Sequence, residues 1–261
     1  MIPGLKAVVF DWAGTMIDFG SRAPVVALCK VFAAHGVPIS EEEARADMGR
    51  AKRDHIAAIL AAPRVAAAWR DAHGSLADEA AIDALFAGIA PLMREAADEC
   101  ALLVPGAAEV AARLRAAGVQ IGSCTGYSRD MMAGILPAAA AQGYAPDLVV
   151  CAGETAEGRP SPLMLWKNLV ELGAWPASAC VKVDDAAVGI AEGRAAGVWT
   201  VGVAASGNGV GLTAEALAAL DPTDRRARID AARADLLAAG AHVVIDTVAD
   251  LPDALRRLAI G

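Results

Sequence analysis

The chain has 261 residues, of which 56% are hydrophobic and 21% charged, so it is long enough for one large domain or two modest ones with a substantial core. This composition excludes a disordered or fibrous protein, because such chains lack the apolar residues that a packed core needs. With 31 acidic and 23 basic side chains the formal net charge is −8, which offers no positive field to a phosphate backbone. We therefore expect no nucleic-acid partner.

Two stretches with few charges, 131–153 and 195–214, are long enough to raise the question of a membrane span. Glycine and polar residues interrupt both of them, which favours buried strands and loops. The first residues lack the features of a secretory signal, and the cysteines have no disulfide or metal-finger spacing. We expect a cytoplasmic protein with no membrane partner and with reduced cysteines that serve packing, at positions 29, 100, 124, 151 and 180.

Short runs of β-forming residues recur along the chain, and helical patterns lie between most of them. This alternation predicts an α/β fold with a doubly wound, Rossmann-like sheet of parallel strands. Such a sheet binds ligands at the carboxyl ends of its strands. The predicted strands cover residues 7–10, 119–122, 148–150, 180–183, 198–201 and 242–245.

One region departs from this alternation. From about residue 20 to residue 100 the sequence shows no convincing strand, only apolar residues at spacings of three and four. Within it, Ser40 and Glu43 form the capping-box pattern that begins a helix. We interpret residues 21–100 as an all-helical cap domain inserted into a core of residues 1–20 and 101–261, with hinges near 19–22 and 100–105.

The residues that end the first two predicted strands are suited to phosphoryl chemistry. Asp11 follows the first strand and is placed as a carboxylate nucleophile, while the second strand runs into Thr125-Gly126-Tyr127, which offers a hydroxyl and backbone amides to an anion. Each has a plainer interpretation, because an aspartate or threonine after a strand is often a turn residue or a helix cap.

The next two strands also end in charged residues. Arg159 follows the third strand between a glycine and a proline, and Asp184-Asp185 ends the fourth with carboxylates of the kind that bind Mg²⁺. Taken singly, Arg159 fits a surface charge and Asp185 a helix cap. Together the four strand ends supply a nucleophile, an anion site, a cation and metal ligands, which is the set that phosphoryl transfer requires.

These four strand ends resemble the four motifs of the haloacid dehalogenase superfamily, and the resemblance spans the whole predicted core. It implies an aspartyl-phosphate at Asp11 and a phosphate bound by Thr125, Gly126 and Arg159. It also implies a Mg²⁺ ion held by the strand-end acids and by one backbone carbonyl, the ligands being Asp11, Ala13 and Asp185.

Two positions depart from the usual pattern of the superfamily. Some members carry a further acid four residues after the metal-binding aspartate, where this chain has Gly189, so Asp184 is expected to replace that carboxylate. Phosphatases and mutases of the superfamily usually carry a second aspartate at the position of Ala13, which protonates the leaving alkoxide. Because alanine donates no proton, an ordinary phosphate ester is a poor substrate candidate.

A lysine could stabilise the leaving group instead, since a Schiff base turns a carbon leaving group into an enamine. Lys52 is the candidate, one of five lysines in the chain. The charges of its neighbours Arg50 and Arg53 are expected to favour its neutral, nucleophilic form. On a helix, Met48 and His55 would share its face, although the spacing alone favours an exposed lysine.

At this point the sequence resembles one family, the phosphonoacetaldehyde hydrolases or phosphonatases. The resemblance rests on Asp-Trp-Ala-Gly-Thr at 11–15, Met-Gly-x-x-Lys at 48–52, Thr-Gly-Tyr at 125–127, Gly-Arg-Pro at 158–160 and Gly-Val-Trp-Thr-Val-Gly at 197–202. It implies hydrolysis of the carbon–phosphorus bond of phosphonoacetaldehyde to acetaldehyde and phosphate, in 2-aminoethylphosphonate degradation, with Mg²⁺ as cofactor and a homodimer as the assembly.

The family resemblance also assigns roles to single residues. It implies a Schiff base on Lys52 and an aspartyl-phosphate on Asp11, and we expect His55 to act as a proton shuttle near the imine. The residues expected to contact the phosphonate substrate are Met48, Thr125, Gly126, Tyr127 and Arg159.

Two other functions remain open from the sequence. The chain could be a dehalogenase or phosphatase of the same fold, and hydrolysis of a simple phosphate ester that survives Lys52→Arg would favour the phosphatase. It could also be a non-catalytic regulator that binds phosphate. The presence of all four motif residues argues against the regulator, whereas phosphate binding without turnover would support it.

Overall fold

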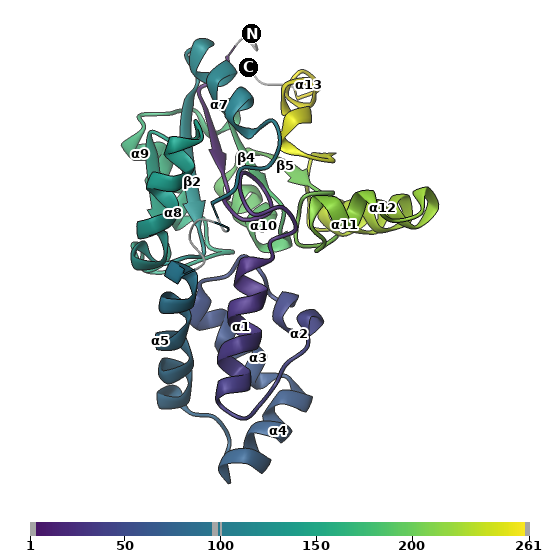
Figure 1. Ribbon diagram of the computed structural model, residues 1–261. Coiled ribbons are helices and arrows are strands. Elements are labelled where there is room, and N and C mark those ends of the chain that lie inside the picture. Colours follow the sequence, from purple (N-terminus) through teal and green to yellow (C-terminus); the bar gives the residue numbers. More distant parts are fainter. Residues whose placement is uncertain (1–3, 96–98, 100, 259–261) are drawn as a thin grey trace.

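The computed structural model describes residues 4–95, 99 and 101–258, and these residues form one six-stranded sheet with helices around it (Figure 1). All neighbouring strands are parallel, in the order β3-β2-β1-β4-β5-β6, which is the doubly wound Rossmann order. The predicted fold class is confirmed. The strands are β1 (Ala7–Phe10), β2 (Gln120–Thr125), β3 (Leu148–Cys151), β4 (Cys180–Asp184), β5 (Trp199–Val203) and β6 (Val243–Ile245).

Both faces of the sheet are covered, which explains why its strands are apolar without alternation. In β1, Val8 and Phe10 pack into one apolar cluster, while Ala7 and Val9 pack into another on the opposite face. The helices that follow or precede the strands supply further side chains to these two clusters and to a third one. They are α7 (Ala107–Ala116), α8 (Arg129–Ala141), α9 (Leu163–Glu171), α10 (Ala187–Ala196), α11 (Ala214–Ala218), α12 (Pro222–Ala238) and α13 (Leu251–Leu255).

Between β1 and α7 the described residues form five helices, which make a separate body beyond the carboxyl edge of the sheet, at the bottom of Figure 1. Among the described residues from 20 to 100 there is no strand, as predicted. The capping box is also confirmed, because Ser40 Oγ accepts a hydrogen bond from Glu43 N and the Glu43 carboxylate accepts one from Ser40 N. These helices are α1 (Ala23–Ala34), α2 (Glu41–Arg45), α3 (Lys52–Ala61), α4 (Pro63–His73) and α5 (Glu79–Glu95).

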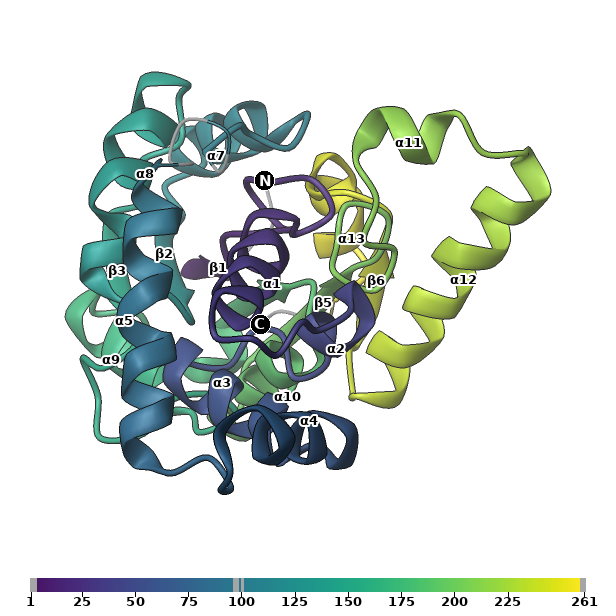
Figure 2. The same cartoon turned by 60° about the horizontal axis from the view of Figure 1, so that its bottom comes forward.

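The helical body lies against the sheet edge, as the view onto it in Figure 2 shows. One contact is made by Arg45 of α2, whose guanidinium donates hydrogen bonds to Asn208 Oδ1 (3.0 Å) and to the carbonyl oxygen of Gly211 (2.9 Å). Both acceptors belong to the loop after β5. These bonds hold the five helices over the carboxyl ends of the strands, where the sequence places the chemistry.

The structure also bears on the expectations about membrane spans and cysteines. The described part of the chain contains no helix with both the length and the apolar character needed to cross a membrane. Four cysteines are free thiols, three of them buried and Cys29 half-buried, while Cys100 lies outside the described residues.

Candidate active site

The parallel register brings the predicted strand-end residues together. Phe10 of β1 pairs with Ser123 of β2 on one side and with Val183 of β4 on the other. The next residues of these three strands therefore meet at one edge, which is why Asp11 lies beside Asp184. The backbone N–H of Asp11 donates to the carbonyl oxygen of Val183 (2.9 Å), which continues the strand pairing into the site.

Three buried carboxylates form the centre of the site. Asp11, Asp184 and Asp185 each contribute one oxygen atom, and these atoms lie within 4.8 Å of one another. Burial, reinforced by the charge of Asp184, raises the pKa of Asp11 to about 6, and burial with both neighbouring carboxylates raises the pKa of Asp185 well above its ordinary value. Such crowded, buried oxygen donors fit a hard divalent cation, which relieves their repulsion.

Asp185 is held in place by the loops around it. Its carboxylate accepts hydrogen bonds from the backbone N–H of Asn208 (2.7 Å) and from Thr15 Oγ1 (3.5 Å). Gly14 adopts a φ of +80°, and a Cβ atom there would lie 2.2 Å from Asp185 Oδ2, so the position requires glycine on two counts. The helix-cap interpretation of Asp185 is wrong, because it is the carboxylate of Asp184 that accepts from Ala186 N, at 3.0 Å.

Asp184 fills space that a side chain at position 189 would need. A Cβ atom on Gly189 would lie 1.9 Å from Asp184 Oδ2, whereas the glycine leaves room for the whole carboxylate. The Asp184 carboxylate therefore occupies the space beside position 189, and its expected role as a replacement for an acid at that position stays a prediction.

Arg159 lies behind the nucleophile candidate and is only 3% exposed, so its interpretation as a surface charge is wrong. Its Nη1 donates to Asp11 Oδ1 (2.7 Å), and its Nη2 donates to the carbonyl oxygen of Cys124 (2.6 Å). Burial alone would lower its pKa, but the charges of Asp184, Glu192 and Asp11 raise it well above the ordinary value. The guanidinium is therefore a permanent cation directed at Asp11.

A small cavity of about 20 Å³ is lined in part by Asp11, with room for about one water molecule. The core contributes Thr125, Gly126 and Tyr127 to its lining, and the helical body contributes Met48 and Lys52. The helix-cap interpretation of Thr125 is wrong, because Ser128 caps α8 and Thr125 Oγ1 accepts from Tyr127 N (3.1 Å). The other lining residues are Asp11, Ala13, Ser21, Pro24, Gly49, Asp185 and Ala186.

Lys52, the first residue of α3, is only 2% exposed, which rules out the exposed-lysine alternative. Its Nζ lies 3.8 Å from Met48 Sδ and 5.3 Å from the centre of the Tyr127 ring. Burial lowers its pKa to about 8, opposed by the charge of Asp11 and aided by that of Arg159. A substantial fraction of this amine is therefore neutral near physiological pH.

The physical reason given for a neutral Lys52 needs correction. The guanidinium of Arg53 pairs with Glu79 and Asp83 on the surface, and Arg50 pairs with Asp47. Neither arginine is among the main influences on the pKa of Lys52. The depressed pKa comes first from burial, which a sequence window around the lysine does not reveal.

The expected helical face of Lys52 is only partly correct. Met48 precedes α3, so the prediction that it shares a helix face with Lys52 is wrong, although its sulfur still contacts the amine. His55 lies on α3 and is completely buried. Burial lowers the pKa of His55 to about 3, so its imidazole is neutral at pH 7. The role of proton shuttle stays a prediction.

Several residues of the site were not singled out from the sequence. Ser21 and Pro24 line the cavity from the chain segment that enters α1. Lys182 and Glu192 are completely buried next to Arg159 and Asp184. The one available signal was Lys182 itself, because a charged residue in the middle of an apolar strand calls for a buried partner.

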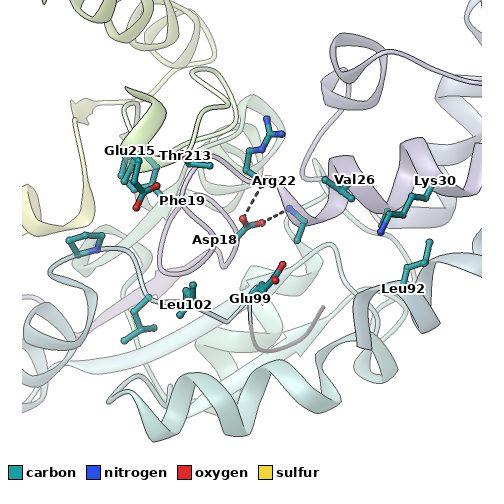
Figure 3. A pocket seen from close by; sticks show the side chains of 15 residues that line it. Asp18, Phe19, Arg22, Val26, Lys30, Leu92, Glu99, Leu102, Thr213 and Glu215 are labelled. Carbon is teal, nitrogen blue, oxygen red and sulfur yellow. Dashed lines mark hydrogen bonds between the residues drawn. The ribbon is translucent and has the colours of Figure 1, made fainter. Parts of the chain in front are cut away.

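A larger cavity, of about 450 Å³, lies at the junction of the two bodies, beside α1 and α11 (Figure 3). Near its floor, the Asp18 carboxylate accepts hydrogen bonds from the backbone N–H groups of Arg22 and Ala23, both at 3.0 Å, and so caps the start of α1. Burial raises the pKa of Asp18 to about 6. Asp11 and Asp185 of the acidic cluster line the smaller cavity, so size does not identify the reactive site here.

The fold and the acidic strand ends define the class of protein. The sequence model of the haloacid dehalogenase-like hydrolases matches residues 5–197. A solved hydrolase from Pseudomonas syringae shares the fold with a TM-score of 0.71 at 19% identity, covering 97% of this chain and 99% of its own.

Relatives with higher sequence identity identify one family within this class. Phosphonoacetaldehyde hydrolase from Paraburkholderia xenovorans (strain LB400) is 52% identical over 95% of this chain and 92% of its own length, and that from Hahella chejuensis (strain KCTC 2396) is 49% identical over 96% and 85%. The crystal structure of a phosphonoacetaldehyde hydrolase-like protein from Oleispira antarctica covers 100% of this chain and 96% of its own, with a TM-score of 0.95 at 42% identity. The chain belongs to the phosphonoacetaldehyde hydrolase family.

Proposed function

We propose that this protein hydrolyses the carbon–phosphorus bond of phosphonoacetaldehyde to acetaldehyde and phosphate. The observation that carries the proposal is a buried amine and a buried carboxylate on one small cavity, Lys52 from the helical body and Asp11 from the sheet edge. The names of the relatives supply the substrate. The amine suits its carbonyl group and the carboxylate suits its phosphorus atom.

The proposed reaction begins at Lys52. Its neutral amine attacks the aldehyde carbon and water leaves, which forms an imine that takes up a proton at nitrogen. Asp11 then attacks phosphorus, the carbon–phosphorus bond breaks, and its electron pair moves into the imine to give an enamine. The enamine takes up a proton at carbon, and one water hydrolyses the imine to acetaldehyde and the free amine. A second water releases phosphate from the aspartyl-phosphate and restores Asp11.

This route explains the alanine at position 13. A phosphate ester leaves as an alkoxide and needs a proton donor, whereas an enamine forms when the imine accepts the electron pair. Ala13 lies on the lining of the cavity and offers no acid there. The methyl group of Ala13 is therefore compatible with a substrate that has a carbon leaving group, and it disfavours a phosphate ester as substrate.

The residues that would hold Mg²⁺ are Asp11, Asp184, Asp185 and the backbone carbonyl of Ala13. A bound Mg²⁺ ion would neutralise negative charge on the phosphonate and on the carboxylates, so that the two can approach each other. Thr125 and Gly126 line the cavity and would bind the phosphonate oxygens. Arg159, which the sequence also predicts to contact the phosphonate, is not among the lining residues, and it would act instead by orienting Asp11.

We also propose that residues 21–100 form a cap domain over a core of residues 1–20 and 101–261. The small volume of the cavity supports this division, because the cap must open to admit a substrate. The homodimer and the cytoplasmic location stay predictions. Val26 of α1 is 40% exposed and could contribute to a dimer contact, and sedimentation of a purely monomeric species would reject the dimer.

The test is to measure acetaldehyde and phosphate released from phosphonoacetaldehyde with Mg²⁺ by the native protein and by Lys52→Arg. We expect equal amounts of both products from the native protein and none from the variant, because arginine keeps the charge but forms no imine. Surface Lys167→Arg is the matched control and should retain full activity.

The outcomes separate the alternatives. A native protein that releases neither product would rule out the proposed substrate. Activity of Lys52→Arg on phosphonoacetaldehyde would leave the substrate standing and remove the imine. Hydrolysis of a simple phosphate ester that is insensitive to Lys52→Arg would favour the phosphatase.

A further inference from the structure

A network of charged side chains lies under the nucleophile, away from the cavity. Its members are Arg159, Lys182, Asp184 and Glu192, whose side chains are all 0% exposed. The two cations and two anions balance one another. Because moving charges out of water is costly, such a network persists only where each member has close partners.

Glu192 of α10 stands between the two cations. Its Oε2 accepts a hydrogen bond from Arg159 Nε (3.0 Å) and lies 3.2 Å from Lys182 Nζ. Lys182 Nζ is also 3.2 Å from Asp184 Oδ2. The single carboxylate oxygen of Glu192 thus fixes the inner end of the Arg159 guanidinium, and Lys182 supplies the charge that balances it.

All three nitrogen atoms of the Arg159 guanidinium donate hydrogen bonds. Glu192 accepts from Nε, the carbonyl oxygen of Cys124 accepts from Nη2, and Asp11 accepts from Nη1. Three acceptors fix the orientation of a planar group. Nη1 also has two longer contacts, with the carbonyl oxygen of Gly49 and with Asp184 Oδ2, both at 3.5 Å. Without the Nε contact the remaining bonds are all made by the two Nη atoms, so the orientation of the guanidinium toward Asp11 is less well fixed.

We propose that Glu192 is a positioning residue, which sets the orientation of Arg159 and through it the attack geometry of the Asp11 carboxylate, with Lys182 as its counter-charge. This inference deepens the proposed function and rests on Asp11 as the nucleophile. Glu192 does not touch the cavity and acts through Arg159. Its effect is large because a misplacement of about 1 Å can reduce a rate by about 100-fold.

The test compares two double variants of equal charge, Lys182→Met/Glu192→Gln and Lys182→Met/Glu192→Leu. Both remove the buried pair and keep similar side-chain volumes. Only glutamine retains an oxygen that can accept from Arg159 Nε. The comparison therefore isolates the orienting hydrogen bond from the loss of charge and from any effect on folding, which unfolding in urea monitors for both variants.

Three readouts are followed. We expect the leucine variant to hydrolyse phosphonoacetaldehyde with a kcat about 10- to 100-fold below that of the glutamine variant. Capture of beryllium trifluoride by Asp11 with Mg²⁺, followed by fluorine NMR, should weaken by at least about tenfold in the same comparison. Borohydride trapping of the Lys52 imine with acetaldehyde should be equal in both, because Lys52 lies in the cap.

Each outcome decides the proposal. Equal kcat and equal beryllium trifluoride affinity in the two variants would overturn it, and so would a loss of imine trapping in parallel with turnover, which indicates a general structural defect. If the native protein does not cleave phosphonoacetaldehyde, the proposed function fails separately. The beryllium trifluoride comparison then still decides the role of Glu192, because it needs no organic substrate.

Discussion

Two lysines are almost equally buried, but their pKa values are shifted in opposite directions. Lys182 lies in β4 of the sheet, and Lys52 lies in the helical body. Lys182 is 0% exposed and Lys52 is 2% exposed. Burial and Arg159 lower the pKa of Lys182, but Glu192 and Asp184 more than offset this and raise it above the ordinary value. Burial lowers the pKa of Lys52 to about 8, and the charge of Asp11 offsets only part of that effect.

The difference teaches that the partners of a buried lysine, and not its depth, decide what it can do. In the core, two carboxylates at 3.2 Å keep Lys182 charged, so it is suited to hold other groups in place. Lys52 of the helical body contacts the thioether of Met48 and the ring of Tyr127, and neither stabilises a charge as a carboxylate does. The neighbouring side chains thus make Lys182 a charged structural partner and leave Lys52 as an amine with a lowered pKa.

The largest expected effect separates the two halves of the reaction. Asp11→Asn should lower kcat for phosphonoacetaldehyde by more than about 1,000-fold, because an amide is a poor nucleophile. The amine of Lys52 should still form an imine with acetaldehyde, which borohydride trapping and mass spectrometry would detect. Loss of the imine together with turnover would show that the core carboxylate also controls the cap lysine.

A second prediction contrasts the lysines through stability. Lys182→Met should cost about 3–5 kcal/mol in the free energy of unfolding, because it removes one of the two buried cations that pair with Glu192 and Asp184 and leaves Arg159 alone to balance both carboxylates. Lys52→Met should be neutral or stabilising, since it removes a desolvated amine from apolar surroundings. Urea unfolding of both variants measures the difference, and equal losses would contradict the distinction drawn between the two lysines.

Mg²⁺ should stabilise the core site. At 100 times its dissociation constant, a ligand that binds only the folded state adds about 2.7 kcal/mol. We expect Mg²⁺ to raise the thermal midpoint of the native protein and of Lys52→Met alike, and EDTA to reverse the shift. Asp185→Asn should abolish the shift, because it removes one of the three clustered carboxylates. A shift that persists in Asp185→Asn would place the ion elsewhere.

The smallest effect is the pH dependence of imine formation. Only the neutral amine attacks a carbonyl, and a pKa lowered to about 8 means that the neutral form appears at lower pH than for an ordinary lysine. The initial rate of borohydride-trapped imine formation at Lys52 should therefore rise about tenfold per pH unit below pH 8 and level off above it. A rate that continues to rise to pH 10 would indicate an unperturbed lysine.

Much of the fold and the acidic site could be predicted from local sequence. All six strands lie where the apolar runs indicate, since a strand buried on both faces must be apolar throughout. Asp11, Thr125, Asp184 and Asp185 could be grouped from the sequence because parallel strands end at one edge. The residue spacing failed at Met48, since α3 begins only at Lys52.

The sequence did not predict the network of Arg159, Lys182, Asp184 and Glu192, although the charged Lys182 in an apolar strand was one signal of it. Glu192 is an ordinary helix residue in the sequence, and nothing in its spacing shows that it faces the guanidinium of Arg159, 33 positions away. The lowered pKa of Lys52 could not be predicted from its sequence neighbours either. Its adjacent arginines point to surface carboxylates, while the groups that act on it come from distant parts of the chain.

The sequence by itself determined the sheet, the helices between its first two strands and the candidates for the reactive groups, because apolar periodicity and strand-end chemistry are local properties. Only the tertiary structure decided which of these groups are buried, which are paired and which face one cavity. Burial and charge pairing depend on residues far apart in the chain, so the ionisation of Lys52, the contacts of Arg159 and the position of Glu192 follow from the packed fold alone.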